Sequence, residues 1–94
     1  MNLVIGYGKI VSEIDFKFIY DRYNCGEKYN YTSIAKCKIE LLNNSIVEIY
    51  GYDEVADSMY RNFGDSNFIL IEGQLNEKIK IEVRRIIHLN LDCL

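Results

Sequence analysis

One segment of helical periodicity interrupts a chain that otherwise alternates with a period of two. The apolar residues of this segment form a single stripe at helical spacing: Val55, Ala56, Met59, Tyr60 and Phe63. Asp53 is the expected N-cap, and Gly64 supplies a stop signal. Residues 53–63 are therefore predicted to form a helix of about three turns. The position of this one helix among the strands limits the folds that the chain can adopt.

The segments on both sides of the helix read as strands. In residues 31–41 the apolar side chains Ala35, Cys37 and Ile39 alternate with Lys36 and Lys38, as in a half-buried strand. Further strands are expected at residues 45–52, 67–75 and 78–89. Residues 3–11 and 14–20 are expected to form a long, bent first strand, because the glycines at positions 6 and 8 favour a bulge or sharp coiling.

The resulting order is three strands, one helix and two strands. A five-stranded barrel with a helix between strands 3 and 4 is the plan of the oligonucleotide/oligosaccharide-binding (OB) fold. The prediction is thus one all-β domain over residues 1–94, a length with room for a single domain. The expected core is Ile10, Cys37, Ile39, Val47, Ile49, Val55, Met59, Ile69, Ile71, Ile81 and Val83. Ile79 is also expected to face inward, and Arg85, which breaks the alternation, indicates a bulge or the barrel rim.

The charge balance and the cysteines limit the possible partners and compartments. The formal net charge is −3, so a nucleic-acid role requires a local basic strip on an acidic background. Three cysteines without a C-x-x-C spacing argue against a disulfide framework or a zinc site, and Cys37 reads as a small buried hydrophobe. No apolar stretch approaches the roughly 20 residues of a membrane span, and no secretory signal is recognised. We expect a protein of the reducing cytoplasm without a cofactor.

Catalytic patterns are weak in this chain. His88 is the only histidine and lies in an apolar run, which favours a structural role over that of a general base. No Ser/His/Asp or Cys/His set can be assembled. The pair Gly6 and Gly8 lacks the third glycine and the following helix of a dinucleotide-binding motif. The expectation is a protein that is not an enzyme.

Several segments, in the same order and at similar spacing, resemble bacterial single-stranded-DNA-binding proteins (SSB-like OB-fold proteins). Residues 8–10 and 15–18 (GKI and DFKF) resemble the family's Gly-x-Leu step and its acidic–apolar–basic–aromatic quartet. Residues 35–39 (AKCKI) and 49–51 (IYG) are similar to an inner strand and to an apolar–Phe–Gly step. Residues 69–75 (ILIEGQL) match a Val-x-Val-Glu-Gly-x-Leu pattern. The resemblance spans nearly the whole chain.

This resemblance implies a non-catalytic module that binds single-stranded DNA or RNA and associates as a homodimer through the first strand. The apolar segment 3–11, which a monomer would leave as an unprotected edge, fits that association. Two features of the family are missing. The sequence has no tryptophan, and the basic hairpin before the last strand is cut to Asn76-Glu77. Any strand binding is therefore expected to be weak.

The candidate binding residues combine cations with aromatic faces, which single-strand binders need for phosphates and bases. Tyr50 corresponds to a stacking Phe of the family, and Tyr52 faces the same way. The full candidate set is Lys9, Lys17, Lys36, Lys38, Tyr50, Tyr52 and Arg84. Each member also has a plain structural reading: a lysine on a solvated face, a tyrosine that covers a sheet, or an arginine paired with a carboxylate.

Two functions of different classes stay open at this stage. The first is a minimal OB module for single-stranded nucleic acid. The second is an OB-fold adaptor that binds a protein, or an acidic inhibitor, in which nucleic-acid binding was lost with the tryptophans and the basic hairpin. The Tyr and Arg residues around the loop at 21–30 suit either partner, because both residue types are also enriched at protein interfaces.

Overall fold

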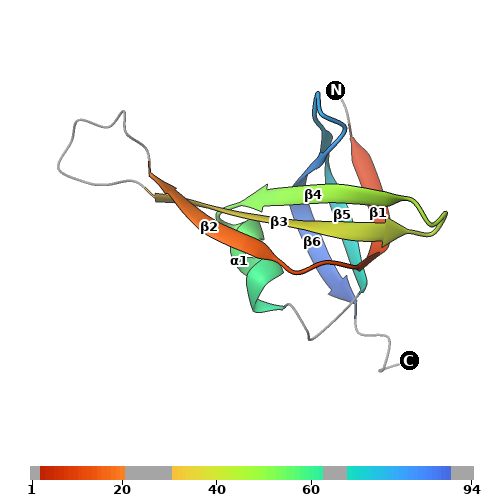
Figure 1. Cartoon of the computed structure of the whole chain (residues 1–94), viewed down its shortest axis with the longest axis horizontal. Coiled ribbons are helices and arrows are strands. Elements are labelled where there is room, and N and C mark those ends of the chain that lie inside the picture. Colours follow the sequence, from red (N-terminus) through yellow and green to blue (C-terminus); the bar gives the residue numbers. More distant parts are fainter. Residues whose placement is uncertain (1–2, 21–30, 63–67, 90–94) are drawn as a thin grey trace.

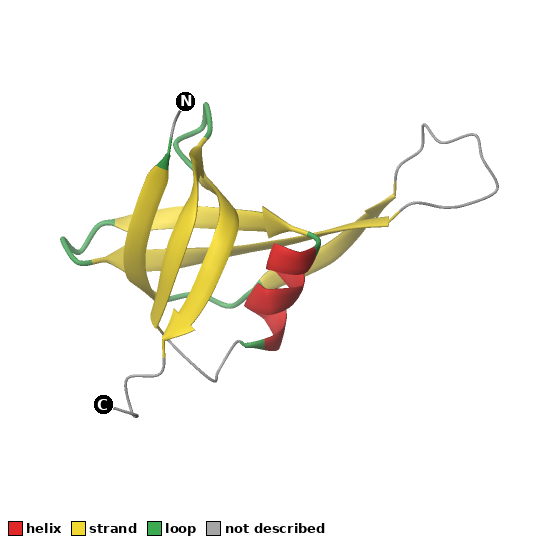
Figure 2. Ribbon diagram, turned by 180° about the vertical axis from the view of Figure 1, so that it is seen from behind, coloured by secondary structure: helices red, strands yellow, loops and turns green. Residues whose placement is uncertain are grey.

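The computed structural model of the chain describes residues 3–20, 31–62 and 68–89. Strands and one helix follow one another along the chain (Figures 1 and 2). Their bounds are β1 Val4–Ile10, β2 Asp15–Tyr20, β3 Tyr31–Leu41, β4 Ile46–Tyr52, α1 Glu54–Arg61, β5 Phe68–Leu75 and β6 Ile81–Leu89.

The strands close into a five-stranded barrel. The sheet order is β1-β5-β6-β4-β3-β2, and an additional pairing of β1 with β3 closes the ring. Strands β1 and β2 are the two halves of the predicted long first strand, because both lie antiparallel to β3. The only parallel pair among the described strands joins β4 to β6. The predicted all-β OB barrel is confirmed. When β1 and β2 are counted as one strand, the helix α1 lies between the third strand, β4, and the fourth strand, β5.

The first strand is less exposed at its edges than the sequence indicated. Residues 4–9 of β1 pair with β5, and residues 8–10 pair with β3 as well. Within the described part of the chain, residues 4–7 keep one edge without a neighbouring strand. The predicted unprotected edge is therefore confined to the beginning of β1.

The core fills the barrel much as the alternation predicted. Nine of the eleven predicted core residues are buried, and the other two, Val47 and Val55, are half-buried and pack against them. Ala35 and Ala56 are fully buried and complete the core. The inward placement predicted for Ile79 is wrong, because this residue lies in the turn before β6 with a φ of 59° and is exposed. Strand β6 therefore begins at Ile81, three residues later than the expected start at residue 78.

The helix contacts β3, β4 and β6 at one end of the barrel (Figure 2). Ala56 and Met59 are its buried residues, whereas Tyr60 is exposed. Asp53 occupies the predicted N-cap position, but its side chain makes no capping hydrogen bond. Gly51 permits the close approach of the helix, because a Cβ at this position would overlap the side chain of Val55. The predicted stop at Phe63 and Gly64 lies outside the described residues.

The irregularity expected near Arg85 is present in the β5–β6 ladder. The register shifts between Glu72, which faces Arg85, and Gly73, which faces Val83. Arg84 is thus the extra residue of a β-bulge, and both Arg84 and Arg85 are exposed. In the described ranges, no helix has the length and apolar character needed to cross a membrane.

Candidate functional site

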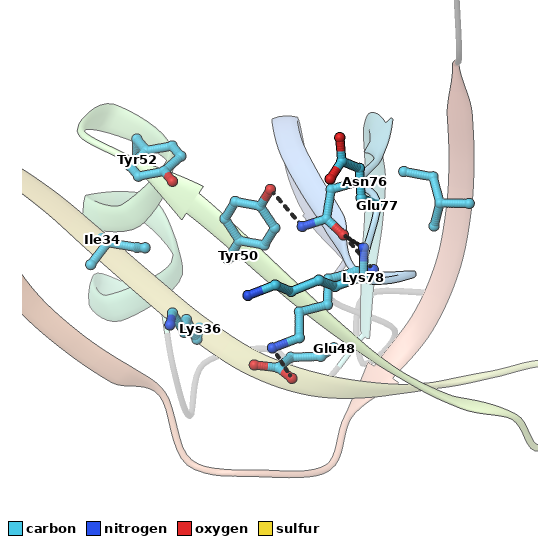
Figure 3. A pocket seen from close by; sticks show the side chains of 10 residues that line it. Ile34, Lys36, Glu48, Tyr50, Tyr52, Asn76, Glu77 and Lys78 are labelled. Carbon is cyan, nitrogen blue, oxygen red and sulfur yellow. Dashed lines mark hydrogen bonds and ion pairs between the residues drawn. The ribbon is translucent and has the colours of Figure 1, made fainter.

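A groove of about 540 Å³ lies on the outer surface of β3 and β4 and is bordered by the turn between β5 and β6 (Figure 3). Its wall on the sheet side is built from cross-strand pairs: Ile34 faces Tyr52, and Lys36 faces Tyr50. The groove is lined by Ile34, Lys36, Glu48, Tyr50, Tyr52, Leu75, Asn76, Glu77, Lys78 and Lys80. The groove therefore brings together residues from three strands and one turn.

Two tyrosine rings stand next to each other on β4. Tyr50 and Tyr52 are two residues apart, so both side chains point to the outer face of the sheet. Their ring centroids are 5.8 Å apart, and the ring planes are nearly perpendicular at 89°. This edge-to-face contact is a favourable aromatic geometry. Tyr50 is half-buried and Tyr52 is exposed. Both predicted aromatic residues line the groove.

Asn76 connects the turn to the aromatic pair (Figure 3). Its Oδ1 accepts hydrogen bonds from the backbone N–H of Lys78 at 2.8 Å and of Lys80 at 3.0 Å. Its Nδ2 donates to the hydroxyl of Tyr50 at 3.0 Å. Since the two backbone donors fix which end of the amide is oxygen, the amino end must face Tyr50. Asn76 thus holds the turn closed and orients the Tyr50 ring.

Three lysines and two glutamates line the groove. Lys36 comes from β3, and Lys78 and Lys80 come from the turn. Lys80 forms an ion pair with Glu48 at 3.1 Å, whereas Lys36 and Lys78 form none with the part of the chain that the structure describes. The groove is locally basic although the whole chain is acidic.

The remaining predicted cations lie at different distances from the groove. Lys38 is exposed on β3 directly opposite Glu48, and Lys17 on β2 is opposite the groove residue Ile34. Lys9 does not line the groove, because it faces Glu40 on β3 and Phe68 on β5. The structure therefore places Lys17, Lys36 and Lys38 on one continuous outer surface and Lys9 apart from it.

The candidate binding residue Arg84 and its neighbour Arg85 have carboxylate partners. The Nε of Arg84 lies 2.6 Å from Glu82, and Arg85 lies 3.8 Å from Glu72. Neither arginine lines the groove. Both arginines therefore pair with acidic side chains at the bulge, as in the structural alternative given for Arg84.

Sequence reasoning missed Asn76, Lys78 and Lys80 as groove residues. The sequence predicts a hairpin cut to Asn76-Glu77 and places the lysines after it in the last strand. The turn instead covers residues 76–80, and Asn76 accepts from the amides of the residues two and four positions later. An asparagine at the start of a turn is the signal that could have indicated this.

Cys37 and His88 have structural roles. The Cys37 thiol is free and buried in the barrel, as predicted, and this burial raises the pKa of the thiol to about 12. His88 on β6 shares a hydrogen bond with the Ser58 hydroxyl of α1, with Nε2 and Oγ 3.2 Å apart. These two residues stabilise the barrel and the docking of its helix.

Comparison with known proteins supports the fold assignment. No protein-family profile matches the chain, and no curated protein matches it. Among solved structures, the SSB domain of a Synechococcus sp. protein superposes with a TM-score of 0.67 at 20% identity, over 94% of this chain and 96% of that one. A small single-stranded DNA binding protein from Mycoplasma pneumoniae gives a TM-score of 0.54 at 20% identity, over 98% and 88%. At this identity the similarity establishes a shared fold.

Proposed function

We propose that this chain is a non-catalytic OB-fold module, formed by residues 1–94, that binds single-stranded nucleic acid in the groove between β3, β4 and the turn 76–80. The observation that carries the proposal is the pair of Tyr50 and Tyr52 rings beside three lysines. This face of the barrel and the turn before its last strand are where OB folds bind oligonucleotides. Of the two proteins with the same fold, one is an SSB domain and the other a small single-stranded DNA binding protein.

In the proposed complex, bases stack on the tyrosines while phosphates follow the lysines. Stacking tolerates any sequence, because every base presents a π-face. Lys36, Lys78 and Lys80 flank the rings, and Lys38 and Lys17 extend the basic path over β3 and β2. DNA and RNA single strands both satisfy this chemistry.

The affinity is expected to be weak. The sequence offers tyrosine and no tryptophan as a stacking residue. Lys80 is already paired with Glu48, and Glu77 adds a second negative charge to the groove lining. These two carboxylates reduce the number of phosphates that the groove lysines can neutralise.

We further propose that two copies associate as a homodimer through the first strand, in the cytoplasm. Residues 4–7 of β1 have one edge without a paired strand in the described structure, and Leu3 and Ile5 beside it are exposed. An exposed strand edge of this kind is a template for pairing with another chain. The reducing cytoplasm suits the free thiol of Cys37.

The test is a fluorescence titration of labelled oligo-dT and oligo-U with the wild-type protein at two salt concentrations. We expect saturable binding that weakens with salt, because each phosphate contact releases about 0.7 counterion from a single strand. Absence of binding to both oligonucleotides at low salt would refute the proposal. The protein-adaptor interpretation would then remain, and pull-down from a bacterial lysate would be the next experiment.

A further inference from the structure

Glu48 is a carboxylate that lines the basic groove. It is on β4, two residues before Tyr50, and its side chain points to the same outer face. Its Oε2 lies 3.1 Å from the Nζ of Lys80, which comes from the turn that borders the groove. Lys38 is directly opposite Glu48 on β3. One carboxylate therefore pairs with a lysine of the turn and lies opposite a lysine of β3.

The position of Glu48 differs from that of the other acidic residue in the groove. The side chains of Glu48 and Lys80 are only 31% and 36% exposed, so this ion pair is partly shielded from water and salt. Glu77 is exposed in the turn and has no ion pair with a described residue. Glu48 thus pairs with one of the groove lysines, Lys80, and Glu77 pairs with none of the described residues.

A phosphodiester and a carboxylate are recognised by lysine in the same way, through a negatively charged oxygen. A strand whose base stacks on Tyr50 must bring its phosphates to the adjacent cations, because base and phosphate belong to the same nucleotide. Glu48 already holds Lys80 and faces Lys38. An incoming phosphate therefore meets a lysine that is already paired, and its binding to Lys80 would leave the Glu48 carboxylate without its partner.

We propose that Glu48 is an internal competitor for backbone phosphate that limits the affinity of the groove for single strands. The proposal rests on the function proposed above. When a strand binds, the phosphate takes the place of the carboxylate on Lys80, and Glu48 takes up a cation from solution. This uptake cancels part of the counterion release that drives binding. The residue thus lowers both the affinity and its dependence on salt.

The test compares Glu48→Gln with the wild type in titrations of labelled oligo-dT from low to moderate salt. Glutamine keeps the size of the side chain and an oxygen that accepts from Lys80, so the turn stays in place. The expected result is binding about fivefold tighter at low salt, the scale of one partly exposed ion pair. The slope of log affinity against log salt is expected to steepen by about 0.7, the counterion release of one phosphate contact on a single strand.

Glu72→Gln is the matched control, because it removes the same charge. Glu72 pairs with Arg85 on the β5–β6 ladder and does not line the groove. Its replacement is expected to change affinity less than about twofold, since exposed ion pairs outside the groove contribute little. An equal gain from both variants would assign the effect to net charge and overturn the proposal.

A cycle with Lys80→Ala identifies the cation involved. The gain from Glu48→Gln is expected to disappear in the Lys80→Ala background, because the freed lysine is its source. A gain of the same size there would contradict the proposal. Wild-type binding without any gain in Glu48→Gln would refute the role of Glu48 alone, and absence of binding in both proteins would refute the proposed function as well. Binding by Glu48→Gln only would support Glu48 as a competitor and refute the proposed function of the wild-type chain.

Discussion

Replacing Asn76 by alanine removes three side-chain hydrogen bonds from the edge of the groove. Two of them close the turn through the amides of Lys78 and Lys80, and the third reaches the hydroxyl of Tyr50. A typical hydrogen bond contributes about 0.5–1.5 kcal/mol net, and exposed ones are at the low end because water replaces them. The bond to Lys78 is exposed, and the other two are part-buried. We expect Asn76→Ala to lower the free energy of unfolding by about 1.5–3 kcal/mol.

The assay is equilibrium unfolding in urea, followed by far-UV circular dichroism. The midpoint should fall while the slope with urea concentration stays constant, because the variant changes stability and not the surface exposed on unfolding. Asn76→Asp should lose much less, since a carboxylate accepts from the same two amides and the Tyr50 hydroxyl can donate to it. Tyr50→Phe removes only the third bond and should cost about 1 kcal/mol or less.

Asn43→Ala is the control from the opposite hairpin. Asn43 accepts one exposed hydrogen bond, at 3.1 Å, from the backbone N–H of Ser45 in the turn between β3 and β4. Its loss should cost about 0.5 kcal/mol. Two results would show that the three hydrogen bonds of Asn76 do not hold the turn. One is an equal free energy of unfolding for Asn76→Ala and Asn43→Ala, and the other is an equal loss of stability in Asn76→Asp and Asn76→Ala.

Four further outcomes are expected. Tyr50→Ala should weaken oligo-dT binding by about 1–3 kcal/mol with little sequence preference, measured by fluorescence titration; an unchanged affinity would remove Tyr50 from the binding path. Joint replacement of Lys36 and Lys38 by alanine should lower the affinity and reduce the salt slope by about 0.7 for each lysine that contacts a phosphate, and an unaltered slope would contradict this contact. Ile5→Lys should convert a dimer into a monomer in light scattering, whereas a monomeric wild type at high micromolar concentration would exclude the proposed association. The pKa of Cys37 is raised from 9.0 to about 12 in the folded state, so its contribution to the free energy of unfolding should be fully present below pH 9 and decline as the pH rises toward 12. Cys37→Ala should lack this part of the decline in urea titrations at alkaline pH.

The order of the elements and most of the core were readable from the sequence alone. Alternation along a strand is a local property, since successive side chains must point to opposite faces. Cys37 and Ile39 could therefore be assigned to the interior, and Lys36 and Lys38 to the outer face, before the partner strands were known. The helix was equally local, because the stripe that carries Met59 has a period that a strand cannot use.

The same rule failed where a turn changed the backbone. Ile79 has the parity of a core residue but adopts a positive φ in the turn and is exposed. The side chain of Asp53 makes no cap although its residue type favours one, because its backbone also has a positive φ and its N–H bonds to the carbonyl of Ser33 on β3. Tertiary contacts decided both conformations.

The candidate site shows the same division between local pattern and long-range contact. Tyr50 and Lys36 could be assigned to an outer face from the sequence, and the structure places them opposite each other in one groove. Asn76 reaches Tyr50 across 26 positions of sequence, and Lys80 pairs with Glu48 across the same groove. No periodicity encodes these two contacts, because they depend on how the turn folds back over β4. The sequence by itself determined which faces the side chains occupy, and the closure of the barrel decided which of them meet.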